Sequence, residues 1–279
     1  MKFTKMHGIG NDFVVINALN EQLDEANFQD MAIKLNDRRF GVGGDGIILI
    51  MPSRVAHYRM RMYNPDGSEA EMCGNGIRCF AKYLYDHKLT QQTDLTVETG
   101  AGILSLKLFP KGGKVGAVRV NMGEPRYQRQ DIPMLGGQPD GNCINEPLKV
   151  NGTTFSITCV SMGNPHAVVI VDDVEKIDVP KYGPLIETNK LFPARTNVHF
   201  VQVISPTELK MRTWERGAGI TFACGTGACA TAVACYLNKK SKRDVLIHLL
   251  GGDLEIEWQG NNQILMTGPA EEVFTGELS

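Results

Sequence analysis

The sequence has no long run of one charge and almost no net charge. Its 29 basic and 31 acidic side chains leave a formal net charge of −2. Binding to nucleic acid or to an anionic membrane surface uses clustered basic residues, so neither partner is expected. The densest basic stretch, residues 239–243, is interpreted as a solvated helix end.

Long apolar runs are also missing. No stretch approaches the roughly 20 apolar residues of a membrane-spanning helix. The first residues, Met1 to His7, lack the apolar core of a signal peptide. We therefore expect a cytoplasmic protein that makes no membrane contact.

The seven cysteines are an odd number, and none form a Cys-x-x-Cys pair. Disulfide frameworks belong mainly to small exported domains, and structural zinc sites usually contain such a pair. We expect free thiols in a reducing compartment and no metal site. Most are predicted to be small core residues: Cys79, Cys143, Cys159, Cys229 and Cys235.

The sequence does contain many short segments in which apolar and polar residues alternate, as in half-buried strands. In the first half these are residues 47–51, 57–63, 102–109 and 118–122. In the second half they are residues 155–162, 167–171, 198–203, 208–214, 245–249, 254–258 and 264–266. Residues 27–39 have helical periodicity, and the Pro- and Gly-containing residues 130–147 are predicted to form a loop or linker.

Two stretches share the pattern Cys-Gly-x-Gly, one beginning at Cys73 and the other at Cys224. Each runs directly into a segment with helical character. Backbone N–H groups and the helix dipole favour an anion at a helix start, which can be a thiolate or a ligand carboxylate. Both stretches are therefore candidate sites for a reactive thiol.

The two halves of the chain match over several further features. Asn11 and Asn164 follow a glycine at equivalent places, and Asn64 and Glu215 each lie nine residues before a Cys-Gly-x-Gly cysteine. Such ordered matches at a period above one hundred residues predict a tandem duplication. We predict domains at residues 1–124 and 125–269, with residues 270–279 packing on the first domain.

Duplicated domains often pack about an approximate two-fold axis, which would bring both thiols to one ligand. Two thiols on opposite faces of a carbon beside a carboxylate can invert it, because one removes a proton while the other delivers one. The two helix starts would stabilise charge that develops on the carboxylate. A dithiol redox role remains an alternative, since facing thiols can also form a disulfide.

The sequence resembles the diaminopimelate epimerase family over nearly its whole length. The motifs that carry the resemblance are 6–13 (MHGIGNDF), 63–69 (YNPDGSE), 73–79 (CGNGIRC), 161–166 (SMGNPH), 195–197 (RTN), 214–219 (WERGAG) and 223–229 (ACGTGAC). The resemblance implies an α/β (α+β) fold of two pseudo-symmetric domains, each a mainly antiparallel, barrel-like sheet around a central helix. It also implies a homodimer and a cofactor-independent epimerase that interconverts LL- and meso-diaminopimelate for lysine and peptidoglycan precursors.

The resemblance assigns roles to matching residues. Catalytic roles fall to Cys73, Cys224, His166 and Glu215. Substrate-binding roles fall to Asn11, Asn64, Gly74, Asn75, Asn164, Asn197, Glu215, Arg216, Gly225 and Thr226. Arg216 suits bidentate carboxylate binding. One departure is Gly46, where many members have glutamine, so no side-chain contact to the substrate's distal end is expected there.

Two related enzyme classes are the nearest alternatives. Proline and hydroxyproline racemases also use a pair of cysteines. The polar residues expected at the distal end of the substrate, which include Glu215 and Arg216, argue against a substrate with an apolar ring. The phenazine-biosynthesis isomerase type lacks the cysteine pair, so Cys73 and Cys224 disfavour it.

Overall fold

The computed structural model describes residues 1–19, 21 and 23–278, and the chain divides into two compact units. Unit 1 is formed by Met1–Asn121 together with the residues from Thr267 onward, and unit 2 is formed by Met122–Met266. Unit 1 therefore contains both ends of the chain, whereas unit 2 is continuous in sequence.

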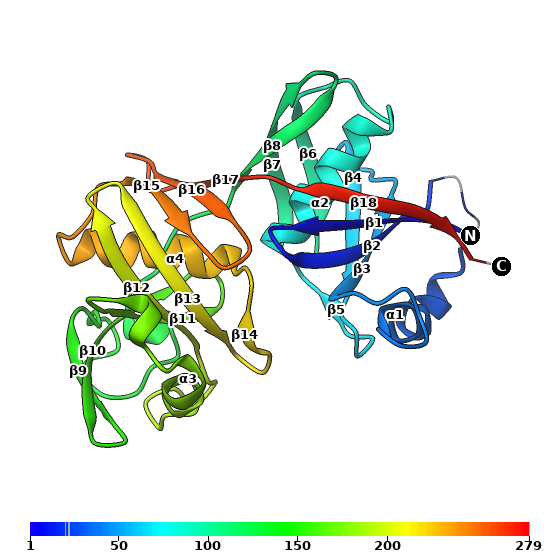
Figure 1. Ribbon diagram of the computed structural model, residues 1–279. Helices are drawn as coiled ribbons and strands as arrows, with labels where there is room; N and C mark the ends of the chain where they lie inside the picture. Colours follow the sequence, from blue (N-terminus) through cyan, green and yellow to red (C-terminus); the bar gives the residue numbers. More distant parts are fainter. Residues whose placement is uncertain (20, 22, 279) are drawn as a thin grey trace. The chain divides into compact units, whose positions relative to one another are not determined.

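The described residues of unit 1 form short strands, two α-helices and one turn of 3-10 helix at Glu25–Asn27 (Figure 1). Its strands are β1 (Lys2–Gly8), β2 (Asn11–Asn17), β3 (Gly46–Met51), β4 (Tyr58–Tyr63), β5 (Glu69–Ala70), β6 (Asp94–Thr99), β7 (Gly102–Lys111), β8 (Lys114–Asn121) and β18 (Glu271–Glu277). Its helices are α1 (Phe28–Asn36) and α2 (Gly74–Asp86).

Most strand pairs of unit 1 are antiparallel. β1 pairs with β2 and β18, β4 with β3 and β5, and β7 with β6 and β8, all antiparallel. The parallel pairs are β2–β3 and β4–β6, where a helix connects the strands. This agrees with the rule that parallel neighbours need a crossover connection.

Helix α2 lies at the centre of unit 1. It is buried from Gly74 through Leu84, and it contacts β1, β2, β3, β4, β7, β8 and β18. A helix enclosed by strands must bury residues on several sides: Ile77 and Leu84 lie on one face of α2, and Cys79 lies on the opposite face. The barrel-like sheet around a central helix is therefore confirmed in this unit.

Unit 2 contains the same kinds of element. Its strands are β9 (Glu146–Val150), β10 (Thr153–Ser161), β11 (Pro165–Ile170), β12 (Asn197–Ser205), β13 (Glu208–Glu215), β14 (Gly219–Thr221), β15 (Asp244–His248) and β16 (Asp253–Trp258), and β17 (Ile264–Gly268) leads out of it. Its helices are α3 (Val179–Glu187) and α4 (Gly225–Leu237), with 3-10 turns at Arg129–Asp131 and Val174–Lys176.

The pairing of unit 2 repeats that of unit 1 strand for strand. β10 pairs antiparallel with β9 and β11, as β1 does with β18 and β2. β11–β12 and β13–β15 are parallel, as β2–β3 and β4–β6 are. Helix α4 contacts β10, β11, β12, β15 and β16 (Figure 1). The duplication predicted from the sequence is therefore confirmed at the level of topology.

The predicted strands are observed. Residues 132–145 form a loop, one of the two alternatives expected for residues 130–147, and β9 begins at Glu146. The loop is not an open linker, because Ile132, Met134 and Cys143 are buried in the core of unit 2. The duplication also implied a counterpart of α1 that we did not predict. That helix is α3, which contains Pro184, a residue that hides helical periodicity.

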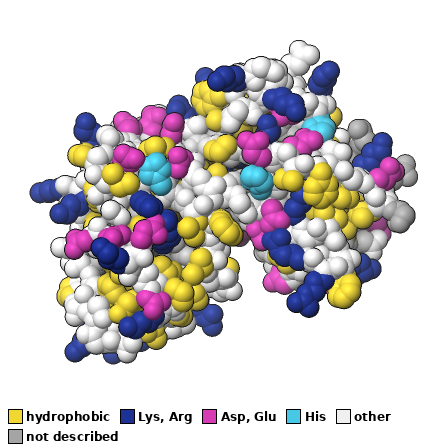
Figure 2. All heavy atoms as spheres, in the orientation of Figure 1, with side chains coloured by type: hydrophobic (Ala, Val, Ile, Leu, Met, Phe, Trp, Pro, Cys, Tyr) yellow, Lys and Arg dark blue, Asp and Glu magenta, His cyan; other side chains and the backbone are white. Residues whose placement is uncertain are grey.

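No helix among the residues that the structure describes is long and apolar enough to span a membrane. Figure 2 shows basic and acidic side chains interspersed over the visible face. This distribution agrees with the near-zero net charge.

Candidate active site

Cys73 occupies the N-cap position of α2, as the sequence predicted. Its backbone is extended (φ −138°, ψ 118°), and its sulfur accepts a hydrogen bond from the Gly76 N–H at 3.5 Å. The thiol is partly exposed. Gly74 and Asn75 form the first turn, where backbone N–H groups have no partner within the helix, so an anion is favoured here.

Asn11 lies beside Cys73 and is held in one orientation. Its Nδ2 donates to Oδ2 of Asp45 at 2.7 Å. Its Oδ1 therefore faces the opposite way and accepts from Asn75 Nδ2 at 3.1 Å and from the Cys73 thiol at 3.7 Å. Because a carboxylate can only accept hydrogen bonds, Asp45 fixes which end of the amide faces the thiol.

Asp45 belongs to a charged cluster at the start of β3. Arg38 donates to both oxygens of Asp12, at 2.7 and 3.1 Å, and to Asp45 at 2.7 Å. Lys5 pairs with Asp12 at 2.6 Å. Burial alone would raise the pKa of Asp12, but the hydrogen bonds from Arg38 and Lys5 outweigh it and lower that pKa to about 2. The cluster makes a rigid support for Asn11.

In this structure Asn64 makes hydrogen bonds within the turn that contains it. Its N–H donates to Ser68 O at 2.8 Å, and its Nδ2 donates to Ser68 Oγ at 3.0 Å. Gly46 is the first residue of β3 and pairs with Phe13 of β2; an added Cβ would lie 2.9 Å from the Tyr63 carbonyl oxygen. Backbone crowding therefore accounts for glycine at that position.

Cys224 is the N-cap residue of α4, in extended backbone (φ −132°, ψ 103°), and only 5% of its surface is exposed. The next residue is Gly225, the first of the helix, and the Thr226 hydroxyl lies 3.8 Å from the Cys224 sulfur. Asn164 Nδ2 donates to that hydroxyl at 3.4 Å. Unit 2 thus places Cys224, Gly225, Thr226 and Asn164 together, as unit 1 does for Cys73, Gly74, Asn75 and Asn11.

His166 extends this arrangement into the core. Its Nε2 lies 2.8 Å from Asn164 Oδ1, and its Nδ1 lies 2.9 Å from His199 Nε2. His199 Nδ1 is in turn 3.1 Å from the Thr213 hydroxyl. Both rings have no exposed surface, and burial lowers the pKa of His166 well below its usual value and that of His199 to about 3. Both are therefore neutral at pH 7.

The ligand atoms of His166, His199 and Cys224 lie within 4.8 Å of one another, a set that could hold a metal ion. The two ring nitrogens, however, are 2.9 Å apart, which is a hydrogen-bond separation. Two imidazole nitrogens on one tetrahedral zinc would lie roughly 3.3 Å apart, given Zn–N bonds of about 2.0–2.1 Å. The geometry therefore fits a shared proton better than a shared metal.

Glu215 and Arg216 lie at the end of β13 and in the turn that follows it. Glu215 accepts from the Thr221 hydroxyl at 2.5 Å, and Arg216 donates to Ala194 O at 3.0 Å. Asn197 bonds to backbone at both ends of its amide: Nδ2 to Pro165 O at 2.9 Å, and Oδ1 from the Arg216 N–H at 3.0 Å. Its clearest role here is to hold the turn that carries Arg216.

Sequence reasoning missed Asp45, His199 and Thr213. Only the repeat could have drawn attention to the two unit 2 residues. In register, β3 and β12 match each other, so His199 takes the place of Ile48. A buried histidine where the other copy has an isoleucine is a departure visible in the aligned halves.

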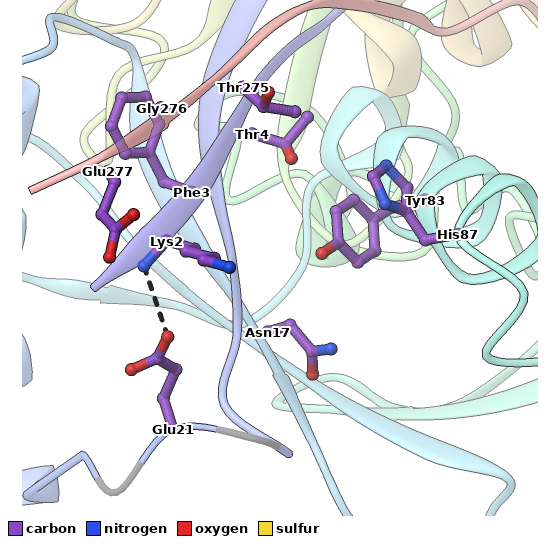
Figure 3. A pocket seen from close by; sticks show the side chains of 10 residues that line it. All are labelled: Lys2, Phe3, Thr4, Asn17, Glu21, Tyr83, His87, Thr275, Gly276 and Glu277. Atoms are coloured by element: carbon purple, nitrogen blue, oxygen red, sulfur yellow. Dashed lines mark hydrogen bonds between the residues drawn. The ribbon is translucent and has the colours of Figure 1, made fainter.

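A surface hollow of about 580 Å³ lies elsewhere in unit 1 (Figure 3). It is lined by Lys2, Phe3, Thr4, Asn17, Glu21, Tyr83, His87, Thr275, Gly276 and Glu277. The Tyr83 and His87 rings stack at 4.0 Å on one wall. None of the residues predicted from the sequence as functional lines this hollow.

Solved structures of similar fold place the chain in a class of two-domain proteins. A phenazine biosynthesis protein of the PhzF family from Bacillus anthracis has a TM-score of 0.71 at 18% identity and covers 100% of this chain and 99% of its own. A hydroxyproline epimerase from Agrobacterium vitis has a TM-score of 0.68 at 15% identity and covers 100% and 90%. At these identities the likeness concerns the fold alone.

Sequence similarity is more specific. A family model described as diaminopimelate epimerase matches residues 3–128 and 158–273. Diaminopimelate epimerases from Agathobacter rectalis and Moorella thermoacetica are 56% and 54% identical to this chain, and each comparison covers 100% of this chain and 99% of the relative. The chain therefore belongs to the diaminopimelate epimerase family.

Proposed function

We propose that this protein interconverts LL- and meso-diaminopimelate without a cofactor, in lysine and peptidoglycan precursor biosynthesis. The observation that carries the proposal is the repeated unit in a chain of this family. Cys73 and Cys224 cap equivalent helices of two units with the same strand pairing. A reversible inversion needs two acid–base groups of similar strength, and a duplicated thiol supplies them.

In the proposed reaction one thiolate removes the α-proton and the other thiol delivers a proton to the opposite face. Negative charge that develops on the adjacent carboxylate would be stabilised by N–H groups at the starts of α2 and α4. Gly74, Asn75, Gly225 and Thr226 belong to these first turns and are the proposed donors to the carboxylate.

We assign the remaining polar residues to acid–base support and to the distal end of the substrate. His166 is neutral and bonded to Asn164, so it would influence Cys224 as a hydrogen-bond donor and not as a charge. Glu215 and Arg216 match the ammonium and carboxylate of the distal group in charge. Four asparagines would complete the binding site: Asn11, Asn64, Asn164 and Asn197.

Exchange in heavy water tests the reaction. Reduced protein incubated with LL-diaminopimelate in D₂O should place deuterium at the α-carbon and form the meso isomer, as mass spectrometry and chiral chromatography would detect. If folded protein neither incorporates deuterium nor forms the meso isomer, the proposal is refuted. Proline under the same conditions should gain no deuterium.

The two cysteines can be tested separately. Cys73→Ala and Cys224→Ala should each abolish turnover while the melting temperature changes little. Cys79→Ala is a control for a buried cysteine outside the proposed site; burial raises the pKa of that thiol to about 12. Wild-type turnover in either catalytic variant would refute the assigned roles.

We also propose a cytoplasmic homodimer. All seven cysteines are free thiols, which a reducing compartment preserves. Strand β18 exposes Val273 (57%) and Phe274 (48%), apolar side chains suited to burial against a second copy. Light scattering should give twice the chain mass of 30.7 kDa for wild type and a smaller mass for Phe274→Asp. A monomeric wild type would contradict the proposal.

A further inference from the structure

The equivalent asparagines of the two units are turned in opposite senses. Asn11 presents its carbonyl oxygen toward the Cys73 thiol, 3.7 Å away. Asn164 presents its amide nitrogen toward Thr226, whose hydroxyl lies 3.8 Å from the sulfur of Cys224. Asp45 enforces the first orientation, as described above. In the second, the Asn164 carbonyl oxygen faces His166 of unit 2.

The orientation of Asn164 is coupled to a buried chain of three side chains, which we name the histidine relay: His166, His199 and Thr213. Asn164 offers Oδ1 to His166, so His166 Nε2 carries the proton of that 2.8 Å bond. Since the ring is neutral, its Nδ1 is an acceptor. The 2.9 Å contact to His199 therefore uses a proton on His199 Nε2.

The relay ends at the Thr213 hydroxyl, which can either donate or accept a hydrogen bond. His199 is also neutral, so a proton on Nε2 leaves its Nδ1 as an acceptor for the Thr213 hydroxyl at 3.1 Å. Every donor then points the same way, from β13 through β12 and β11 toward α4. Hydrogen bonds aligned in one direction polarise and strengthen one another.

Two donors lie at the far end of the relay. With Oδ1 turned to His166, the Asn164 amide donates to the Thr226 oxygen at 3.4 Å. A hydroxyl that accepts there keeps its own proton free to donate, and the Cys224 sulfur lies within 3.8 Å of it. If His166 held the other tautomer, Asn164 would have to rotate and this donation would be lost.

Comparison of the two units shows that packing alone does not require the relay. The equivalent positions in unit 1 hold Phe13, Ile48 and Met62, all buried. The fold therefore accommodates three apolar side chains at these places. Burying polar groups stabilises less than burying apolar ones of similar size, so a polar set in one copy indicates a functional role.

We propose that His199, supported by Thr213, is a positioning residue that holds His166 as its neutral Nε2–H tautomer and so turns Asn164 and Thr226 into donors beside Cys224. Its importance for turnover rests on the proposed function. The tautomer itself can be measured without any substrate. His199 is expected to touch neither substrate nor the reacting atoms.

Nitrogen NMR of histidine-labelled wild-type protein tests the tautomer directly. Protonated and unprotonated ring nitrogens have well-separated ¹⁵N shifts, and difference spectra with His166→Gln and His199→Gln assign two of the six histidines. At pH 7.5 both rings should be neutral with the proton on Nε2. A proton on Nδ1 of either ring, or a charged ring, would overturn the proposal.

A matched pair of variants tests the consequence. His199→Gln places an amide N–H₂ where Nε2 was, within reach of His166, whereas His199→Asn places it where Nδ1 was, near Thr213 only. Gln should keep the His166 signature and near wild-type kcat/KM. Asn should lose the signature and lower kcat/KM about tenfold, as expected for one hydrogen bond.

The remaining outcomes are also decisive. Equal losses in both variants would show a packing role, and no loss in the Asn variant would show that His199 has no role in turnover; either result refutes positioning. If Asn fails to fold, the wild-type and Gln spectra still decide. If wild type leaves diaminopimelate unexchanged but shows the stated tautomers, the proposed function fails and the relay stands.

Discussion

Gly227 in the first turn of α4 is a position where a single methyl group should disturb the surroundings of Cys224. A Cβ there would lie 2.3 Å from Cε1 and 2.6 Å from Nε2 of His199, and 2.9 Å from the Cys224 sulfur. Non-bonded carbon atoms prefer about 3.5–4.0 Å, so the imidazole would have to move by about 1 Å or more. That movement breaks its hydrogen bond to His166.

Three terms set the expected loss of stability for Gly227→Ala. Overpacking costs about 1–3 kcal/mol, and unsatisfied buried ring nitrogens cost about 1–3 kcal/mol. Better helix propensity returns up to about 1 kcal/mol. A net loss of about 1–6 kcal/mol in a unit of this size corresponds to a fall of roughly 3–20 °C in Tm.

Gly76 is the matched control, because it occupies the same position in α2. There a Cβ would meet only the end of the Ile48 side chain at 3.1 Å, and Cys73 Cβ and Met62 Sδ at 3.5 Å. Gly76→Ala should therefore melt within about 2 °C of wild type, since small shifts of flexible ends offset the helix gain.

Calorimetry and the deuterium-exchange assay measure both effects. Gly227→Ala should lower the melting temperature and reduce kcat/KM more than tenfold, whereas Gly76→Ala should change both little. If both variants behave alike, the contact between His199 and the first turn of α4 does not matter and the reasoning fails.

Asp45→Ala should free the Asn11 amide and lower kcat/KM about tenfold, as loss of one charged hydrogen bond predicts; an unchanged value would contradict a positioning role. Acid should weaken unit 2, because buried neutral histidines have a lower pKa than in the unfolded chain: their stabilisation is present above pH 6.5 and is lost as pH falls. Urea unfolding should show a loss of about 2 kcal/mol for each of His166 and His199 between pH 7.5 and 5.0, and His199→Gln should lose correspondingly less. Truncation after Ala270 removes β18 from β1 and should make unit 1 protease-sensitive while unit 2 survives; equal sensitivity of both units would argue against independent stability.

Much of this fold could be predicted from the sequence because its signals are local. Alternating strands, helix starts at Cys73 and Cys224, and the repeat all depend on residue order. Helix α3 was not predicted because Pro184 interrupts the helical pattern of apolar residues. Only the repeat implies that this helix exists. The loop within residues 130–147 could be predicted from its turn-rich composition, but composition does not reveal that Ile132 and Cys143 are buried in it.

The cysteines and their glycine frames could be found from the sequence, but the groups that orient them could not. Asp45 acts on Asn11 across 34 residues of chain, and His199 acts on His166 across 33. Such contacts depend on strand register, which periodicity does not specify. Hydrogen-bond direction depends on tautomers and amide orientation, which residue type leaves open.

The placement of β18 has a consequence for how the protein is made. Most of unit 1 precedes unit 2 in the chain and is synthesised before it, yet β1 gains its partner β18 only after unit 2 has been made. Unit 2 is continuous and can complete its pairing while the C-terminal strand is still being synthesised. The unit whose synthesis starts first therefore completes its pairing after the other, and the edge of β1 stays open to other strands until β18 has been synthesised.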